Sequence, residues 1–146
     1  MKNSPKTLAL LLSTLVSVAA CGKSADAPGA AGGGAADGPA SITVPANLAD
    51  LVSKADAKQG EALFNSKGCK ACHNLTDVKL VGPGLKGVAA RRSVTWMAKM
   101  ILKPEVMIKE DEEAKKLFAA MMAPMANQNV AADTELPLLL AFLKTL

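Results

Sequence analysis

Residues 69–73 hold the pattern with the clearest chemical meaning in this chain, Cys69-x-x-Cys72-His73. Two thiols separated by two residues can each add to one vinyl group of a haem and become thioethers. A histidine directly after the second cysteine then lies beneath the iron, where its Nε2 can act as the proximal ligand. This spacing with an adjoining histidine is typical of c-type haem attachment, so we predict that these three residues bind a covalent haem.

Two other chemistries also use a pair of cysteines at this spacing. A thioredoxin-like redox motif lies within alternating strands and helices, and no such pattern accompanies residues 69–73. A structural zinc site needs about four ligands, whereas this chain has one histidine and no cysteine after residue 72. The chain also has no second Cys-x-x-Cys-His, so the sequence favours a single haem.

The first 20 residues have the layout of an export signal. Lys2 and Lys6 precede an apolar run over residues 8–18, which is shorter than the ~20 residues of a membrane-spanning helix. Small residues then lead into Cys21, which resembles the lipobox of bacterial lipoproteins, whose cysteine receives a diacylglycerol group. We therefore predict a lipoprotein signal peptide over residues 1–20 and lipidation of Cys21. The alternative is ordinary cleavage that leaves a free thiol.

Composition divides the rest of the chain into a linker and a domain. Residues 21–47 are rich in Gly, Ala and Pro and lack apolar periodicity, so we predict a flexible linker that begins with the lipid-anchored Cys21. Residues 48–146 have the length of one compact domain. The whole chain has three Phe, one Trp and no Tyr, so this domain has few large side chains for a core. A buried haem would supply the missing apolar surface.

The charge balance of the chain gives no support to nucleic-acid binding. The chain has 17 basic and 13 acidic side chains, and removal of the signal peptide takes away Lys2 and Lys6. The mature chain then keeps 15 basic residues against 13 acidic ones. The two propionates of a haem would roughly cancel this small positive excess.

Helical patterns, without the alternation typical of strands, predict an all-α domain. We expect helices over about residues 55–67, 93–102, 110–122 and 134–144. Gly68 follows the first of these and Pro104 follows the second, as residues that end helices commonly do. Ser93 and Thr134 are the expected N-caps of the second and the last helix. Thr134 in that role places Pro137 in the first turn, where a missing N–H costs little.

Four residues on the first and last of these helices carry a family resemblance. Gly60 and Phe64 are four residues apart, and Leu139 and Phe142 are three apart. The domain resembles small bacterial class I cytochromes c, in which the first helix crosses the last at residues of these types. The resemblance runs in order over residues 55–146 and implies the small cytochrome c fold, in which several helices wrap around one covalently attached haem.

The loop after the haem motif and the single tryptophan extend this resemblance. Residues 82–87 read Gly-Pro-Gly-Leu-Lys-Gly, which by composition is a tight turn. The loop resembles the family's Gly-Pro-x-Leu-x-Gly segment, which implies that the Pro83 carbonyl accepts a hydrogen bond from Nδ1–H of His73. In similar cytochromes an indole in this region donates to a haem propionate, which implies that role for Trp96. Simple burial in the core is the alternative interpretation of Trp96.

Three methionines, Met121, Met122 and Met125, are candidates for the second axial ligand. A thioether is a soft neutral ligand, and histidine–methionine ligation raises the reduction potential of haem iron. The chain offers no second histidine and no tyrosine. The residue types alone leave the choice among the three open. Pro124-Met125 before the last helix resembles the family's ligand segment, although Ala126 stands where the family usually has proline, and this resemblance implies Met125.

Together these features predict a membrane-tethered monohaem c-type cytochrome, which is not an enzyme. It would carry single electrons between redox partner proteins on the periplasmic side of a bacterial membrane. The alternative is a haem enzyme or a small-gas-binding haem sensor with an open sixth site. Residues 101–128 resemble carriers that serve anaerobic respiratory reductases, which suggests such a partner. Four lysines near the motif would either steer an acidic partner or merely solubilise the surface, namely Lys67, Lys70, Lys79 and Lys86.

Overall fold

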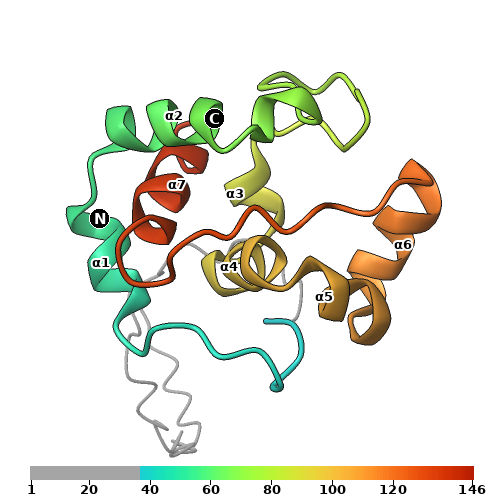
Figure 1. Cartoon of the computed structure of the whole chain (residues 1–146), viewed down its shortest axis with the longest axis horizontal. Helices are drawn as coiled ribbons and strands as arrows, with labels where there is room; N and C mark the ends of the chain where they lie inside the picture. Colours follow the sequence, from blue (N-terminus) through green and yellow to red (C-terminus); the bar gives the residue numbers. More distant parts are fainter. Residues whose placement is uncertain (1–36) are drawn as a thin grey trace, which may run out of the picture.

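The computed structural model describes residues 37–146, so the predicted signal peptide and Cys21 lie outside the described residues. Over this part the chain forms helices and no strand, which confirms the predicted all-α class. The elements in chain order are α1 (Leu48–Lys54), α2 (Ala57–Ser66), the short 3-10 helix η1 (Cys69–Ala71), α3 (Val88–Arg91), α4 (Val94–Leu102), α5 (Pro104–Glu110), α6 (Glu112–Met121) and α7 (Leu136–Leu143). In Figure 1, α1, α2 and α7 lie at the left, α4 lies near the centre, and α5 and α6 lie at the right.

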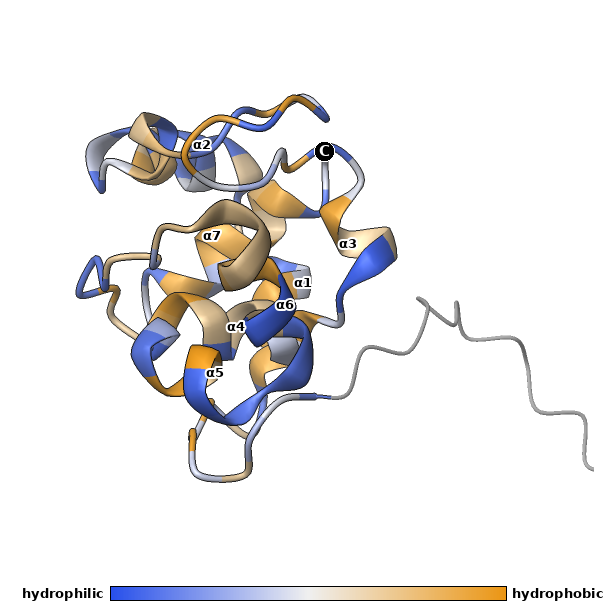
Figure 2. Cartoon of the chain, turned by 90° about the vertical axis from the view of Figure 1, so that its right-hand side faces the viewer, coloured by the Kyte–Doolittle hydropathy of each residue, from blue (hydrophilic) through white to orange (hydrophobic). Residues whose placement is uncertain are grey.

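The core of the domain is centred on α7. This helix is hydrophobic along most of its length (Figure 2), and six of its eight residues are buried. Leu136 and Leu140 have no exposed surface, and the exposed fraction of Leu139 is 2%. Burial of one leucine side chain stabilises a fold by roughly 1.5–3 kcal/mol. α7 therefore holds together the elements that contact it, α1, α2 and α4.

Gly60 explains how closely α2 and α7 pack. A Cβ atom at this position would lie 2.0 Å from the carbonyl oxygen of Leu138 and 2.8 Å from Cβ of Phe142. The close contact offsets the cost of a glycine within a helix, which is about 1 kcal/mol relative to alanine. Phe64 lies one turn further along α2 and is 3% exposed, with its ring centroid 5.5 Å from that of Phe142. The predicted crossing of the first and last helices at these residues is confirmed.

The start and the end of α4 are as predicted. Ser93 Oγ accepts a hydrogen bond from the backbone N–H of Trp96 at 3.0 Å, and the helix runs to Leu102. Pro104 then begins α5. The fixed φ of proline suits the first turn of a helix, whereas its missing N–H would break the interior of α4.

Asp111 separates the predicted helix over residues 110–122 from the helix before it. Its backbone is extended, with φ −101° and ψ 127°, and its carboxylate accepts a hydrogen bond from the backbone N–H of Ala114 at 2.8 Å. α6 therefore starts at Glu112, two residues later than predicted, and Glu110 ends α5. The acidic residues after Asp111 still occupy the first turn of α6, where negative charge suits the helix dipole.

α7 starts at Leu136, so the prediction of Thr134 as its N-cap is wrong. A turn precedes the helix, and in it the Glu135 carboxylate accepts a hydrogen bond from the backbone N–H of Ala131 at 2.8 Å. The backbone N–H of Glu135 donates in turn to the Ala131 carbonyl at 3.0 Å. Because this turn includes Thr134, the helix begins later, and Pro137 still lies in the first turn.

Residues 37–47, which the sequence assigns to the linker, lie against the domain in this structure. Lys99 is only 7% exposed, and its Nζ donates hydrogen bonds to the carbonyls of Gly38 and Pro39 at 3.3 and 2.8 Å. Ile42 is 5% exposed and belongs to the core. The Gly- and Pro-rich composition indicated a linker. One buried isoleucine and one buried ammonium group that needs acceptors nevertheless hold this segment against α4.

Candidate haem site

A cavity of about 250 Å³ opens between α2 and α7 on one side and α4 and α6 on the other. Most of its wall is apolar, and such a wall excludes water and suits a large apolar ligand. The larger apolar side chains that line it are Phe64, Val81, Leu85, Val88, Trp96, Met97, Met100, Ile101, Ile108, Leu117, Phe118, Met121, Met125, Val130, Leu139 and Leu143.

Cys69, Cys72 and His73 all line this cavity, and Pro83 lies beside the histidine ring. The carbonyl oxygen of Pro83 is 2.9 Å from Nδ1 of His73. A carbonyl only accepts hydrogen bonds, so the contact requires the hydrogen on Nδ1 and leaves a lone pair on Nε2. A metal-binding histidine needs this tautomer, and the carbonyl also fixes the orientation of the ring.

Two glycines let the loop after the haem motif approach the motif closely. A Cβ atom on Gly82 would lie 2.6 Å from Cε1 of His73, and one on Gly84 would lie 2.5 Å from the carbonyl oxygen of Thr76. The backbone N–H of Gly82 donates to the Cys72 carbonyl at 2.8 Å. By composition alone the sequence indicated a turn here. The structure adds that a side chain at either glycine would push the loop away from the wall that contains Cys69, Cys72, His73 and Pro83. This wall is the histidine side of the cavity.

Both thiols of the motif are free of disulfide bonds. The backbone N–H groups of Cys72 and His73 donate to the Cys69 carbonyl, at 3.2 and 3.0 Å, so η1 brings the three residues together on one tight turn. Burial raises the pKa of the Cys69 thiol. Among residues 37–146, no three His, Cys, Asp or Glu side chains gather as zinc ligands would. Two thiols and a histidine beside an apolar cavity instead match the needs of covalent haem attachment.

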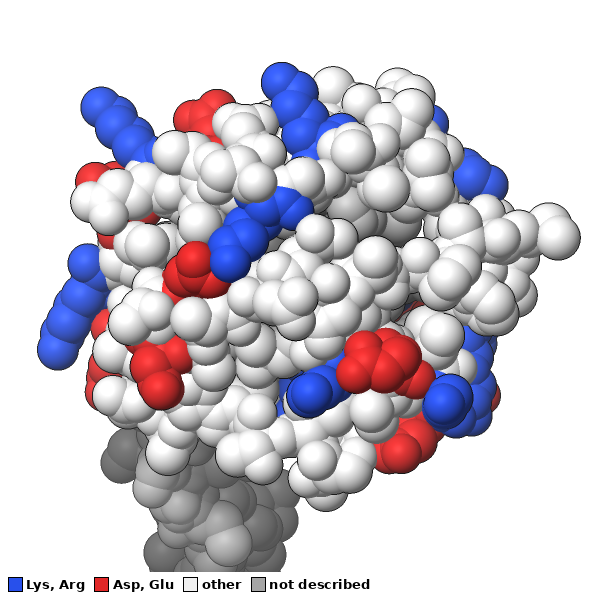
Figure 3. Space-filling model, in the orientation of Figure 1, with Lys and Arg blue, Asp and Glu red and all other residues white. Residues whose placement is uncertain are grey.

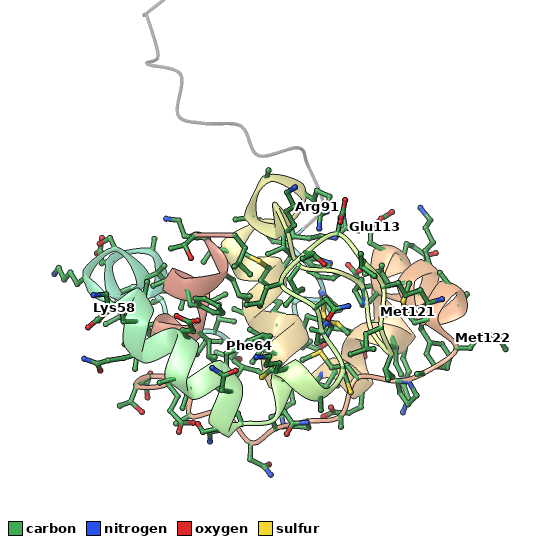
Figure 4. All side chains as sticks on the ribbon, turned by 90° about the horizontal axis from the view of Figure 1, so that it is seen from above. Lys58, Phe64, Arg91, Glu113, Met121 and Met122 are labelled. Carbon is green, nitrogen blue, oxygen red and sulfur yellow. The ribbon has the colours of Figure 1, made fainter. Side chains whose placement is uncertain are left out.

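The candidate methionines divide between the cavity and the surface. Met121 and Met125 line the cavity, from the end of α6 and from the segment that follows it. Met122 is 87% exposed and has a left-handed backbone with φ 56°. Figure 4 shows Met122 at the outer edge of the molecule, pointing away from it. Met122 therefore takes no part in the cavity, and Met121 and Met125 are the two methionines of the cluster that do.

Trp96 lines the cavity, but its indole N–H has a different partner from the expected one. Nε1 donates to the buried carboxylate of Asp111 at 3.1 Å. An indole has a single N–H, so this bond uses the donor that the family resemblance assigns to a haem propionate. In this structure the N–H links α4 to the N-cap of α6, and a contact between Trp96 and the haem stays a prediction. The guanidinium carbon of Arg92 lies 5.0 Å from the Trp96 ring centroid, and Arg92 pairs with Glu113 at 3.2 Å.

Comparison with known proteins identifies the class of molecule to which this site belongs. The family model described as Cytochrome c matches residues 57–146, and the chain therefore belongs to the cytochrome c family. The solved structure of a cytochrome c from Rhodothermus marinus is similar to it, with a TM-score of 0.58 and 27% identity, over 75% of this chain and 89% of that chain. The predicted small cytochrome c fold is thereby confirmed.

Curated relatives match over a shorter part of the chain. It is 60% identical to cytochrome c-551 of Stutzerimonas stutzeri over 37 residues, which are 25% of this chain and 35% of that protein. It is 52% identical to the cytochrome c-type cyt cy of Rhodobacter capsulatus over 40 residues, which are 27% of this chain and 20% of that protein. The matches thus span about a third and a fifth of the lengths of these two relatives.

A member of this family carries a covalently attached haem c, and the residues present fit that group. The apolar cavity suits the macrocycle, and the free thiols lie in its wall. His73 presents Nε2 in the form that binds iron, because the Pro83 carbonyl holds the hydrogen on Nδ1.

Proposed function

We propose that this protein is a membrane-tethered, monohaem c-type cytochrome that carries single electrons. In this role Cys69 and Cys72 attach the haem, His73 is its proximal ligand and Met125 is its distal ligand. The observation that carries the proposal is a single apolar cavity lined both by a histidine in its metal-binding tautomer and by methionine side chains. A six-coordinate iron has no free position for substrate, which suits a carrier better than an enzyme.

The residues of the site hold its geometry constant while an electron enters or leaves. When bound, the haem takes up and releases one electron at its iron. The Pro83 carbonyl keeps the hydrogen on His73 Nδ1 and fixes the ring, so Nε2 would remain free to hold the iron of a bound haem. The apolar wall excludes water, and a thioether ligand raises the reduction potential. Little rearrangement therefore accompanies the transfer.

Met125 is favoured over Met121 by where each lies in the chain. Met121 is the last residue of α6, so the helix sets the direction of its side chain. Met125 lies in the non-helical segment between α6 and α7 and is partly buried against the cavity. The resemblance at Pro124-Met125 adds to this support.

The proposed contact with redox partners is the exposed edge beside Cys72, which is itself exposed. Figure 3 shows extended areas of uncharged side chains between separate groups of Lys, Arg, Asp and Glu on this face. A surface of this kind suits a small and transient contact. A respiratory reductase as one of the partners rests on the resemblance of residues 101–128, and gene neighbourhood would test it.

The tether is proposed from the sequence of the leader. No helix within residues 37–146 has the length and apolar character to cross a membrane. A diacylglycerol group on Cys21, with its two acyl chains, would give stable anchoring, which one chain does not. Cys21→Ser should then release the protein from the membrane fraction with its haem intact. Equal retention of this variant in the membrane fraction would count against lipidation.

The carrier function is tested on the purified holoprotein by spectroscopy and redox titration. We expect a low-spin ferric spectrum with the weak far-red band of methionine ligation, a one-electron titration, and no binding of carbon monoxide to the native reduced protein. A high-spin spectrum that changes at once with carbon monoxide would instead indicate the open sixth site of a haem enzyme or gas sensor.

A further inference from the structure

The segment that carries Met125 has little backbone structure of its own. It leaves α6 at Met122 and reaches the turn before α7 at Ala131. In the described part of the chain, no backbone N–H from residue 123 to residue 130 donates to a backbone carbonyl. Each end contains a residue with left-handed backbone, Met122 at φ 56° and Asn129 at φ 51°. Contacts beyond the backbone of the segment must therefore fix the position of Met125, and one of them is the hydrogen bond from Asn127 Nδ2 to the Leu102 carbonyl at 3.0 Å.

Two lysines from the histidine side of the cavity make further contacts near the two ends of the segment, Lys79 with the last turn of α6 just before it and Lys67 with Asn129 within it. Lys79 Nζ donates to the carbonyl of Ala120 at 2.8 Å, and this carbonyl is one of the last in α6, which have no partner within the helix. Lys67 Nζ donates to the carbonyl of Asn129 at 3.3 Å and pairs with the Glu135 carboxylate at 2.7 Å. Both lysines flank the haem motif in the chain.

We propose that Lys67 and Lys79 are positioning residues that clamp the Met125 segment to the histidine side of the cavity. Through these clamps they set how firmly Met125 binds the iron. This role rests on the proposed function, because it takes Met125 as the distal ligand. For its sulfur to leave the iron, the non-helical segment has to move, and the clamps oppose that movement at both ends.

The clamps change the interpretation of the lysines near the haem motif. The ammonium groups of Lys67 and Lys79 already have partners, so their main role is within the molecule and not in steering a redox partner. Lys70 and Lys86 are exposed, and within residues 37–146 their side chains make no hydrogen bond or ion pair. Because all four carry the same charge near the motif, Lys70 and Lys86 are matched controls for the other two.

The test compares Lys67→Ala and Lys79→Ala with Lys70→Ala and Lys86→Ala in the holoprotein, because alanine carries no side-chain donor. Each change removes one positive charge, but only the first two remove a clamp. Imidazole displaces a distal ligand from ferric haem. The rate of this displacement is measured from the loss of the far-red methionine band. Loss of one hydrogen bond should speed displacement by roughly threefold to tenfold in each clamp variant and by more in the double variant. Amide hydrogen exchange over residues 123–130 should rise in the same variants.

The possible outcomes distinguish a failure of the clamp proposal from a failure of the proposed function. Equal displacement rates in all four variants, in a protein whose unmodified form shows the methionine band, would overturn the clamps and leave the carrier function standing. A lower denaturation midpoint without faster displacement would show a purely structural role for the lysines and would also overturn the clamps. Absence of the band from the unmodified protein would contradict methionine ligation, and with it both proposals.

Discussion

The two sides of the cavity are held in place by different kinds of contact. On the histidine side, the backbone bonds to itself, with Gly82 N–H donating to the Cys72 carbonyl at 2.8 Å and Leu85 N–H donating to the Asn74 carbonyl at 2.9 Å. On the methionine side, residues 123–130 make no such bond within the described chain and depend on side-chain contacts, such as those of Asn127 with the Leu102 carbonyl and of Lys67 with the Asn129 carbonyl. His73, the proposed proximal ligand, is thus held by a loop with its own backbone hydrogen bonds, whereas Met125, the proposed distal ligand, depends on a few separable contacts.

The largest effect is expected from removing the haem, which would fill the cavity between the two sides. An empty cavity of about 250 Å³ costs about 6 kcal/mol at roughly 24 cal/mol per Å³. This is similar to the whole stability of a typical domain, ~5–15 kcal/mol. Cys69→Ala combined with Cys72→Ala should therefore abolish cooperative thermal unfolding, measured by circular dichroism. A sharp two-state melt of this variant would show that the haem is not part of the core.

A smaller effect is expected from disturbing only the histidine side. In Gly82→Ala the added Cβ would lie 2.6 Å from the His73 ring, and overpacking of this kind costs roughly 1–3 kcal/mol. The ring should shift relative to the iron, which changes the reduction potential and the haem spectrum. Gly68→Ala is the control, because a Cβ there meets nothing within 4 Å and adds only the strain of φ 76°. Equal spectra for the two variants would contradict a tightly fixed proximal side.

The smallest effect is expected from the ion pair at the end of the methionine segment. The hydrogen bond from Lys67, with a further one from the Ala131 N–H, lowers the pKa of Glu135 from its usual 4.5. A carboxyl with a lower pKa in the folded state contributes stability above its unfolded pKa and loses it as the pH falls through the folded value. The unmodified protein should therefore lose more stability than Glu135→Gln as the pH drops below 4.5.

The measurement for this pair is the denaturation midpoint as a function of pH. The pair is at the surface, so the difference should be small. Glu61→Gln, at an exposed position on α2, serves as the control. Parallel curves for the unmodified protein and Glu135→Gln would show that the Lys67–Glu135 pair contributes nothing measurable.

The contrast between the two sides also explains what the sequence could predict. The chemistry of attachment fixes the spacing of Cys69, Cys72 and His73 within five residues, so the sequence predicts the proposed proximal site directly. The sequence also predicted that the first and last helices cross at Gly60, because Gly60 and Phe64 with Leu139 and Phe142 match the family's pattern. The clamps of the methionine side join residues 41 and 62 positions apart, and no local pattern signals such pairs.

The features that the sequence did not reveal include contacts between distant residues and one short helix. Asp111 carried a signal as a helix N-cap, because it precedes an acidic first turn, but nothing in the sequence linked it to the Trp96 indole fifteen residues away. The spacing of Leu48 and Val52, both buried, could have indicated α1, although a helix of seven residues leaves a weak periodic signal. The packing of residues 37–47 depends on Lys99, more than fifty residues further along the chain.

The central claim, that Met125 is the ligand opposite His73, is tested most directly by comparing Met125→Ala with Met121→Ala. The ferric far-red band and the binding of carbon monoxide to the reduced protein are measured for both. We predict that Met125→Ala loses the band, binds carbon monoxide readily and has a lower reduction potential, while Met121→Ala keeps the band and excludes carbon monoxide. Loss of the band in Met121→Ala with its retention in Met125→Ala would contradict the assignment and move the ligand to the end of α6.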